Sequence, residues 1–377
     1  MKTYYLDHAA TTPLNPIVLE TMIPYMTVHY GNPSSMHQMG IEVKKAINES
    51  REKVGSIFQI DPKGVIFTSG GTEATNLAIL GYAKAHPERN EIIISSIEHH
   101  ATLHTCDALR KMGYVIHVVP VNHEGFIDID GYKNHLNEQT LMVSFIWANN
   151  EIGTIQDMKT IGHLAHQVGA YVHVDGVQMV PHHAIDLSQY PIDLLTLSAH
   201  KFYGPKGIGA LLIKQPKDIE PIVFGGKQEL GLRSGTENVY GIIGLAKALE
   251  LQMKAKDDVG LDVKKNMAML RDQLQKELPM ICFNGPMDET KRLPGLLSLS
   301  LPNVASQDLA FALDDLGIFV STGSACLSNE IVSSHVLKAI GVDDNVGTIR
   351  ISMGQRLTDQ DIKEITLRVK KAYRKLT

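Results

Sequence analysis

The sequence predicts an α/β fold built on a mainly parallel sheet, and three features indicate this class. Through the first two thirds of the chain, apolar segments of strand length alternate with helical patterns. Polar or glycine-rich residues follow several of these segments, where an open parallel sheet binds its ligands. The length of 377 residues exceeds one compact core and favours a large domain with a smaller one attached.

The elements of the large domain follow from these patterns in chain order. The predicted strands are 64–70, 91–96, 114–121, 141–150, 170–176, 193–200 and 208–213. The helices predicted between them include 73–85, 101–112 and 159–168. Seven strands separated by helices predict a seven-stranded sheet with the helices packed on its faces.

The pattern changes at about residue 257. A long amphipathic helix at 261–278 is followed by a strand at 296–302 and a helix at 307–316. A capping box, Thr358 to Asp361, precedes the last amphipathic helix. We therefore predict a large domain over 15–256 and a small α+β domain formed by 1–14 and 257–377.

Composition restricts the kinds of partner. The formal net charge is -5 and no Lys/Arg block is present, so we expect no nucleic acid and no anionic membrane surface as a partner. No apolar run approaches the ~18 residues of a membrane span, and the first residues lack the apolar core of a signal peptide, so we expect a cytoplasmic protein. An odd number of cysteines, three, favours reduced thiols over a disulfide framework.

The first strand of the predicted sheet runs into a glycine-rich turn and a helix. Gly70 and Gly71 allow close approach of a ligand to the backbone, and Thr72 with the free N–H groups of the helix start forms a phosphate cradle. The alternative is a plain capped helix without a ligand.

Two later strands end in residues that carry charge. Asp175 ends the strand 170–176, with Gln178 just after it, and a buried carboxylate there needs a protonated pyridine nitrogen, a metal or an arginine. Lys201 follows the strand 193–200, next to Ser198 and His200. A lysine desolvated at that edge is a candidate Schiff-base amine, and the alternative is a solvated lysine.

Pyridoxal phosphate requires all three features. It is a phosphate ester, it has a ring nitrogen that works best protonated, and it forms an imine with lysine. An anion cradle, a carboxylate and a lysine at neighbouring strand ends therefore predict this cofactor more strongly than any one of them.

Cys326 lies in "STGSACLSNE" (321–330), among small turn-forming residues. A structural cysteine usually lies among apolar residues, whereas a loop of this kind exposes a thiolate to other molecules. This stretch alone is equally compatible with a reactive thiol and with a loop cysteine that has no function.

Ten motifs, in order and over nearly the whole chain, resemble those of the cysteine desulfurases of the NifS/IscS type, within the class V aminotransferases. They are YLDHAATTP (5–13), GNPSS (31–35), FTSGGTEATNLAI (67–79), IEHHA (97–101), NNEIGTIQ (149–156), HVDGVQ (173–178), SAHKFYGPKGIGAL (198–211), RSGTEN (233–238), GSAC (323–326) and IRISMG (349–354). The resemblance implies a pyridoxal-phosphate enzyme of fold type I.

It also implies roles at the cofactor ring. Lys201 would form the Schiff base and later move a proton, and Asp175 would keep the ring nitrogen protonated. His99 would stack on the ring and assist proton transfer. Gln178, with Asn150, would bond the phenolic oxygen of the cofactor.

For the phosphate, the resemblance implies Gly71, Thr72, Ser198 and His200. Thr236 is similar to a residue that reaches the phosphate of the neighbouring subunit, so the resemblance implies a homodimer.

For the substrate, L-cysteine, the resemblance implies that Arg350 binds the carboxylate with a bidentate pair, assisted by Asn32 and Asn150. Cys326 would take the substrate sulfur as a persulfide, leaving L-alanine. The persulfide would then pass to an acceptor protein for iron–sulfur cluster assembly, for another thio-cofactor or for tRNA thiolation.

Other functions are also compatible with these residues. A selenocysteine lyase or another class V aminotransferase would share these motifs, and a sulfur-trafficking protein without activity would share the fold. A metal hydrolase is the remote alternative, with His100 and His104 four residues apart and His99, His173 and Asp175 as further ligands. That alternative gives Lys201 no purpose, and we predict no metal.

Overall fold

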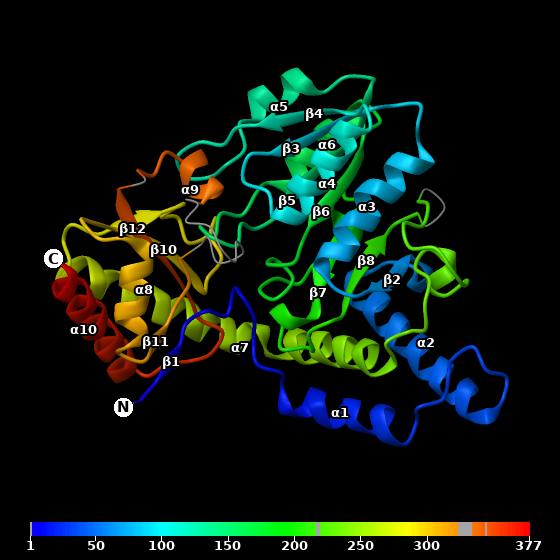
Figure 1. The fold of residues 1–377 in the computed structure, drawn as a ribbon, viewed down its shortest axis with the longest axis horizontal. Helices are drawn as coiled ribbons and strands as arrows, with labels where there is room; N and C mark the ends of the chain where they lie inside the picture. Colours follow the sequence, from blue (N-terminus) through cyan, green and yellow to red (C-terminus); the bar gives the residue numbers. More distant parts are fainter. Residues whose placement is uncertain (1, 216–218, 323–333, 344) are drawn as a thin grey trace.

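The computed structural model describes residues 2–215, 219–322, 334–343 and 345–377. Its largest feature is a seven-stranded sheet of order β2-β8-β7-β6-β5-β3-β4 (Figure 1). The strands are β2 (Val65–Thr68), β3 (Glu91–Ser95), β4 (Val115–Val119), β5 (Thr140–Ile146), β6 (Tyr171–Asp175), β7 (Leu194–Ser198) and β8 (Gly209–Ile213). β8 runs antiparallel to β2 and β7, and the other pairs are parallel. The predicted α/β class and mainly parallel sheet are confirmed.

Helices cover both faces of this sheet because its strands are apolar on both faces. In β3, Ile92 and Ile94 join one apolar cluster with residues of α3 and α4, whereas Ile93 joins the cluster on the opposite face. The covering helices include α2 (Gln38–Phe58), α3 (Gly71–Ala85), α4 (His100–Lys111), α5 (Ile129–His135) and α6 (Met158–Gln167), whereas α1 (Pro16–Thr27) packs on α7 (Val239–Glu277). The 3-10 turns are η1 (Pro62–Gly64), η2 (Leu187–Gln189), η3 (Ala199–Lys201) and η5 (Glu229–Gly231).

The C-terminal third forms a smaller antiparallel sheet of order β12-β10-β9. Its strands are β9 (Cys282–Asn284), β10 (Leu296–Pro302) and β12 (Val346–Ser352). The helices of this region are α8 (Ser306–Asp314), α9 (His335–Ala339) and α10 (Asp359–Leu376), and the capping box predicted before α10 is present.

The N-terminal strand belongs to this smaller region. β1 (Tyr4–Tyr5) pairs in parallel with β11 (Ile318–Phe319), and Tyr4 and Leu6 join an apolar cluster whose other members lie between 263 and 376. Figure 1 shows both chain ends beside α10. This separate core supports the proposed division into 15–256 and 1–14 with 257–377, whose bounds stay a prediction.

One helix differs from the sequence-based expectation. The helix predicted at 261–278 is the second half of α7 (Val239–Glu277), which has 39 residues and runs beneath both sheets in Figure 1. The polar run from Lys254 to Asp258 reads as a break, but lysine and alanine are good helix formers, so the helix continues through it. The proposed domain boundary therefore falls inside a continuous helix.

None of the described helices is both long enough and apolar enough to cross a membrane.

Candidate active site

The N-terminus of α3 meets the ends of two other strands. The N-cap is Gly70, which has no side chain to satisfy the first N–H groups of the helix. A Cβ added to Gly71 would lie 3.0 Å from Val177 Cγ2 and 3.5 Å from Ser198 Cβ, so the helix start lies against the turn after β6 and the end of β7. Unsatisfied N–H groups, a missing side chain and the Ser198 hydroxyl fit a phosphate.

Asp175 lies at the end of β6 and is 6% exposed. Its Oδ1 accepts a hydrogen bond of 3.0 Å from the Val177 N–H. Burial raises the pKa of this carboxyl, and the charges of His99 and Lys201 act against that shift. A buried carboxylate of this kind fits a cationic ring nitrogen.

Lys201 ends the turn η3, directly after β7. Its Nζ donates to the carbonyl oxygens of Ala9 at 2.6 Å and Ala10 at 2.8 Å. The side-chain amide of Gln178 donates to the same Ala9 oxygen at 2.8 Å. The segment after β1 therefore brings two predicted cofactor ligands together.

His99 caps α4, and its Nδ1 accepts from the Ala101 N–H at 3.1 Å. Burial is the main cause that lowers the pKa of His99, and the positive charge of Lys201 lowers it further. The negative charge of Asp175 acts in the opposite direction on the pKa of His99. His99, Asp175 and Lys201 therefore lie close enough to influence one another's charge.

His200 lies beside the N-terminal segment, with its Nδ1 3.1 Å from Thr11 Oγ1. Burial, followed by the charges of Lys201 and Lys206, lowers the pKa of His200 to about 4. The ring is therefore neutral at neutral pH and would interact with a phosphate by a hydrogen bond rather than by charge.

Arg350, on β12, is 5% exposed. Its Nη2 lies 2.6 Å from Asp7 Oδ1, and its Nη1 donates to the Asn150 carbonyl oxygen at 3.0 Å. The buried Nε has no hydrogen-bond partner among the described residues. The guanidinium thus keeps a donor for an anion where the two predicted domains meet.

Three predicted residues stand apart from this cluster. Asn32 is exposed in the loop between α1 and α2, where its side chain accepts from the Ser34 N–H. Thr236 is exposed in the loop before α7. Cys326 lies outside the residues that the structure describes.

The histidines do not form a metal centre within the described ranges. The rings of His100 and His104 lie 5.2 Å apart, but no group of three His, Cys, Asp or Glu side chains described in the structure has a geometry that would hold a metal ion. His173 is fully buried, with Nδ1 2.8 Å from Ser144 Oγ and Nε2 3.0 Å from Thr196 Oγ1. Burial lowers its pKa to about 3, which is typical of a neutral core histidine.

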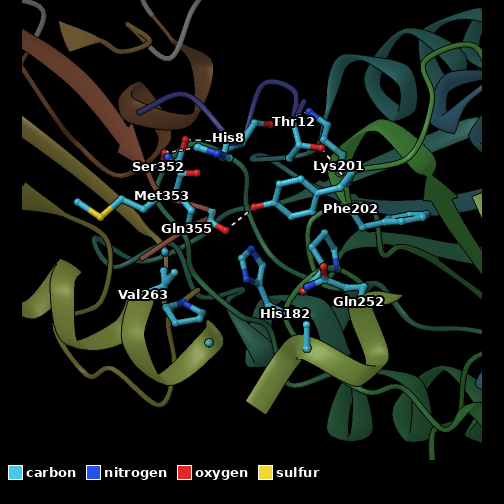
Figure 2. A pocket seen from close by; sticks show the side chains of 18 of the residues that line it. His8, Thr12, His182, Lys201, Phe202, Gln252, Val263, Ser352, Met353 and Gln355 are labelled. Atoms are coloured by element: carbon cyan, nitrogen blue, oxygen red, sulfur yellow. Dashed lines mark hydrogen bonds between the residues drawn. The ribbon is translucent and has the colours of Figure 1, made fainter. Parts of the chain in front are cut away.

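A cavity of about 510 Å³ borders the cluster. Figure 2 shows Lys201 at one side of it and Met353 and Val263 at the other, with the ring of His182 pointing toward the space between them. Lys201, Gln178 and Ala9 line both this cavity and the cluster. The cavity therefore gives the site an apolar neighbour built from both halves of the chain.

Sequence reasoning missed two buried glutamates. Glu98, within IEHHA, is fully buried, and burial raises its pKa to about 8. Glu151, within NNEIG, is 7% exposed, and burial raises its pKa to about 7. A glutamate in a polar loop usually remains in water, so only their place inside otherwise functional motifs marks them.

Comparisons with known proteins agree with this architecture. The family Aminotransferase class-V matches residues 4–365. The chain is 43% identical to a cysteine desulfurase IscS of Clostridium botulinum over 364 residues, which are 96% of this chain and 92% of that protein.

Two solved structures are also similar. A NifS-like protein has a TM-score of 0.93 at 34% identity and covers the full length of both chains. A structure described as SspA in complex with cysteine has a TM-score of 0.80 at 30% identity over 94% of this chain and all of that one.

The chain therefore belongs to the class V aminotransferases, enzymes of the pyridoxal-phosphate fold type I class. Within this family it belongs with the cysteine desulfurases of the NifS/IscS type. The resemblance, the fold type and the enzyme class predicted from the sequence are confirmed.

Proposed function

We propose that this chain removes sulfur from L-cysteine, with pyridoxal phosphate held where β2, β6 and β7 end and with Cys326 as the sulfur acceptor. The observation that carries the proposal is the convergence of Lys201, Asp175 and the Gly71 cradle on one edge of the sheet. When bound, the cofactor supplies an aldehyde that condenses with amines and a ring that withdraws electrons from the bound amino acid.

The residues at the ring act through charge and proton transfer. Lys201 would hold the aldehyde and then carry the proton taken from the substrate's α-carbon, and Asp175 would stabilise a protonated ring nitrogen. His99 is kept neutral by burial, so it would stack on the ring and accept or donate a proton. Gln178 and Asn150 would bond the phenolic oxygen.

The phosphate would be held by Gly71, Thr72, Ser198 and His200, which supply N–H groups, hydroxyls and an imidazole. Arg350 would bind the substrate carboxylate through its unpartnered Nε and one Nη, with Asn32 assisting. The Asp7 carboxylate fixes this guanidinium in place and partly neutralises it before substrate arrives.

The sulfur step balances without an external oxidant. Cys326 Sγ forms an S–S bond with the substrate sulfur as the Cβ–S bond breaks, and the electron pair left on Cβ takes up a proton. The products are L-alanine and an enzyme persulfide, which a sulfur-acceptor protein would consume. We place this chemistry in the cytoplasm, where reducing conditions keep the cysteines as thiols.

A homodimer forms part of the proposal. Large apolar side chains are exposed along α1 and the following loop, and exposed apolar surface of this kind is often covered by an interface. The exposed side chains are Ile17, Leu19, Ile23, Met26, Val28, Tyr30 and Met36. In a dimer, Asn32, which is in that loop, and Thr236 would reach the partner's site, which accounts for their exposure in one chain.

The experiment is direct. The purified protein, loaded with pyridoxal phosphate, should be yellow and should release L-alanine from L-cysteine, and borohydride reduction should attach the cofactor to Lys201. Light scattering should give the mass of two chains, and the substitution Ile23→Asp should lower it. A colourless protein, or a label on another lysine, would contradict the proposal.

Comparing L-cysteine with L-selenocysteine as substrate would distinguish the desulfurase from a selenocysteine lyase. The 43% identity to a protein named cysteine desulfurase favours the former.

A further inference from the structure

α9 follows the segment that contains Cys326 and packs on the large domain. Val336 and Leu337 of α9, with Ile340 just after it, join an apolar cluster with Ile97, Ile146 and Ile152. A helix of only five residues is unstable alone, so the position of α9 depends on this apolar packing and on the contacts at its ends.

The first of these contacts is at Ser334, the N-cap. Its Oγ accepts hydrogen bonds from the N–H groups of Val336 at 3.1 Å and Leu337 at 3.2 Å. The single hydroxyl hydrogen is therefore donated to Glu151 Oε2, at 2.5 Å. A second contact joins His335 Nε2 to the Glu98 carbonyl oxygen at 2.9 Å.

Glu151 is itself held firmly beside the substrate-binding arginine. Its backbone N–H donates to Asn149 Oδ1 at 2.9 Å, and the carbonyl oxygen of the preceding residue, Asn150, accepts from Arg350 Nη1 at 3.0 Å. Burial raises the pKa of the Glu151 carboxyl, whereas the hydrogen bond from Ser334 and the charge of Arg350 act against that shift. The carboxyl oxygen Oε2 can accept the Ser334 hydroxyl whether or not the group is ionised.

The other flank of the same segment is attached to Arg350 as well. The backbones of Ser321 and Arg350 exchange two hydrogen bonds, of 3.2 Å and 2.6 Å. Of the two described flanks of the Cys326 segment, Ser321 is therefore bonded to Arg350 itself, and Ser334 is bonded to Glu151, whose neighbour Asn150 contacts Arg350.

We propose that Glu151 is a positioning residue for sulfur transfer. Through its hydrogen bond with Ser334 it fixes the C-terminal flank of the Cys326 segment close to Arg350, which would bind the substrate carboxylate. This inference rests on the proposed function. Glu151 contacts neither substrate nor cofactor in this proposal, and its effect is confined to the step in which Cys326 meets the substrate sulfur.

The test compares two reactions of the dimeric holoenzyme. Exchange of the α-hydrogen of L-alanine in deuterated water needs the cofactor and Lys201 but no thiol. Persulfide formation from L-cysteine in a single turnover needs Cys326 in place. The variants are Glu151→Ala, Glu151→Gln and Ser334→Ala.

A matched control is available in the same region of the chain. Thr358 caps α10 and donates to the Asp361 carboxylate at 2.7 Å, so it forms the same kind of hydroxyl and carboxylate pair at another helix start. Thr358→Ala removes that cap without touching α9.

We expect Glu151→Ala and Ser334→Ala to slow persulfide formation by about tenfold to a hundredfold, since small misplacements of reacting groups have effects of this size. Exchange should stay within about twofold of the wild-type rate, well below such an effect. Glu151→Gln should recover most of the persulfide rate because its amide oxygen still accepts from Ser334, and Thr358→Ala should change neither reaction.

Equal losses in both reactions would mean a general structural role and would overturn the proposal, as would an unchanged persulfide rate in both Glu151→Ala and Ser334→Ala. Absence of exchange in the wild-type holoenzyme is a different result, because it would refute the proposed function itself.

Discussion

The Nζ atom of Lys201 lies 2.6 Å from the carbonyl oxygen of Ala9, although 192 residues separate the two in sequence. The same oxygen accepts from Gln178, so the N-terminal segment holds the lysine on the side of the sheet where Asp175 and Gly71 lie. An amine placed between backbone carbonyls is oriented before any cofactor arrives.

Replacing this lysine should abolish both colour and turnover. We expect Lys201→Ala to lose the yellow band and at least about a hundredfold in L-alanine formation, because an imine-forming amine and a proton carrier are lost together. Absorbance spectra and a product assay would measure the two effects. The exposed Lys63, when changed to Ala, should leave both unchanged.

Two cysteines offer a matched pair for testing the sulfur acceptor. Cys326→Ala should keep the colour of the holoenzyme and lose persulfide formation, because the cofactor ligands remain and only the attacking thiolate is removed. Cys282 is exposed on β9, so Cys282→Ala is the control and should retain activity. Persulfide on Cys282 in the Cys326→Ala variant would contradict the assignment of the acceptor.

Glu98 should make stability depend on pH. Its folded pKa is about 8 against an ordinary value of 4.5, so between these values the folded chain holds a proton that the unfolded chain has lost. Stability should therefore fall as pH rises through this window, by up to about 1.4 kcal/mol per pH unit from this group. Urea unfolding at several pH values would measure it.

The substitution Glu98→Gln removes that titration. We expect the free energy of unfolding of the wild-type chain to fall between pH 5 and pH 8 more than that of the variant, because only the wild type carries this titrating carboxyl. A difference between variant and wild type that does not change with pH would show that the wild-type carboxyl keeps an ordinary pKa.

A buried ion pair fixes the loop that leads to Thr236. Glu229 is 6% exposed, its Oε1 lies 2.6 Å from Arg51 Nη2, and its Oε2 accepts from the Phe67 N–H at 2.8 Å. Glu229→Ala leaves the half-buried Arg51 guanidinium without its carboxylate partner and the Phe67 N–H without its acceptor, at a cost of about 3 kcal/mol. Urea midpoints would measure the loss.

The exposed pair of Lys45 and Glu49 on α2 serves as the comparison. Glu49→Ala should change the free energy of unfolding by less than about 1 kcal/mol, because water screens the pair. Equal effects at Glu229 and Glu49 would contradict the assignment of Glu229 as a structural anchor.

The elements of the fold were largely predictable because their signals are local. The strand at 296–302 is β10 within the same bounds, and the unbroken apolar run of β3 is typical of a strand buried on both faces. The predicted strand ends were less accurate. β5 stops at Ile146, whereas the prediction extended the strand to residue 150, and beyond this end the Asn149 side chain donates to the Ile97 carbonyl oxygen. That partner, 52 residues away, is not visible in the local pattern.

The site shows the same limit. Asp175 and Lys201 could be found because parallel strands end on one edge, and this rule needs no distances. The bond from Arg350 to Asp7 joins residues 343 apart, and the Glu151 carboxyl accepts from Ser334, 183 residues further along the chain. Such contacts depend on how distant segments come together, so they were absent from the sequence-based predictions.

The 39-residue helix α7 has a mechanical consequence. Its first half contributes Ile242, Leu245 and Leu249 to the core of the large sheet, and its second half contributes Leu270 and Leu274 to the core of the small one. At 1.5 Å per residue it is a rod about 59 Å long. Because one continuous helix belongs to both cores, unfolding of either core should destabilise the other. Heating should therefore give one calorimetric peak rather than two.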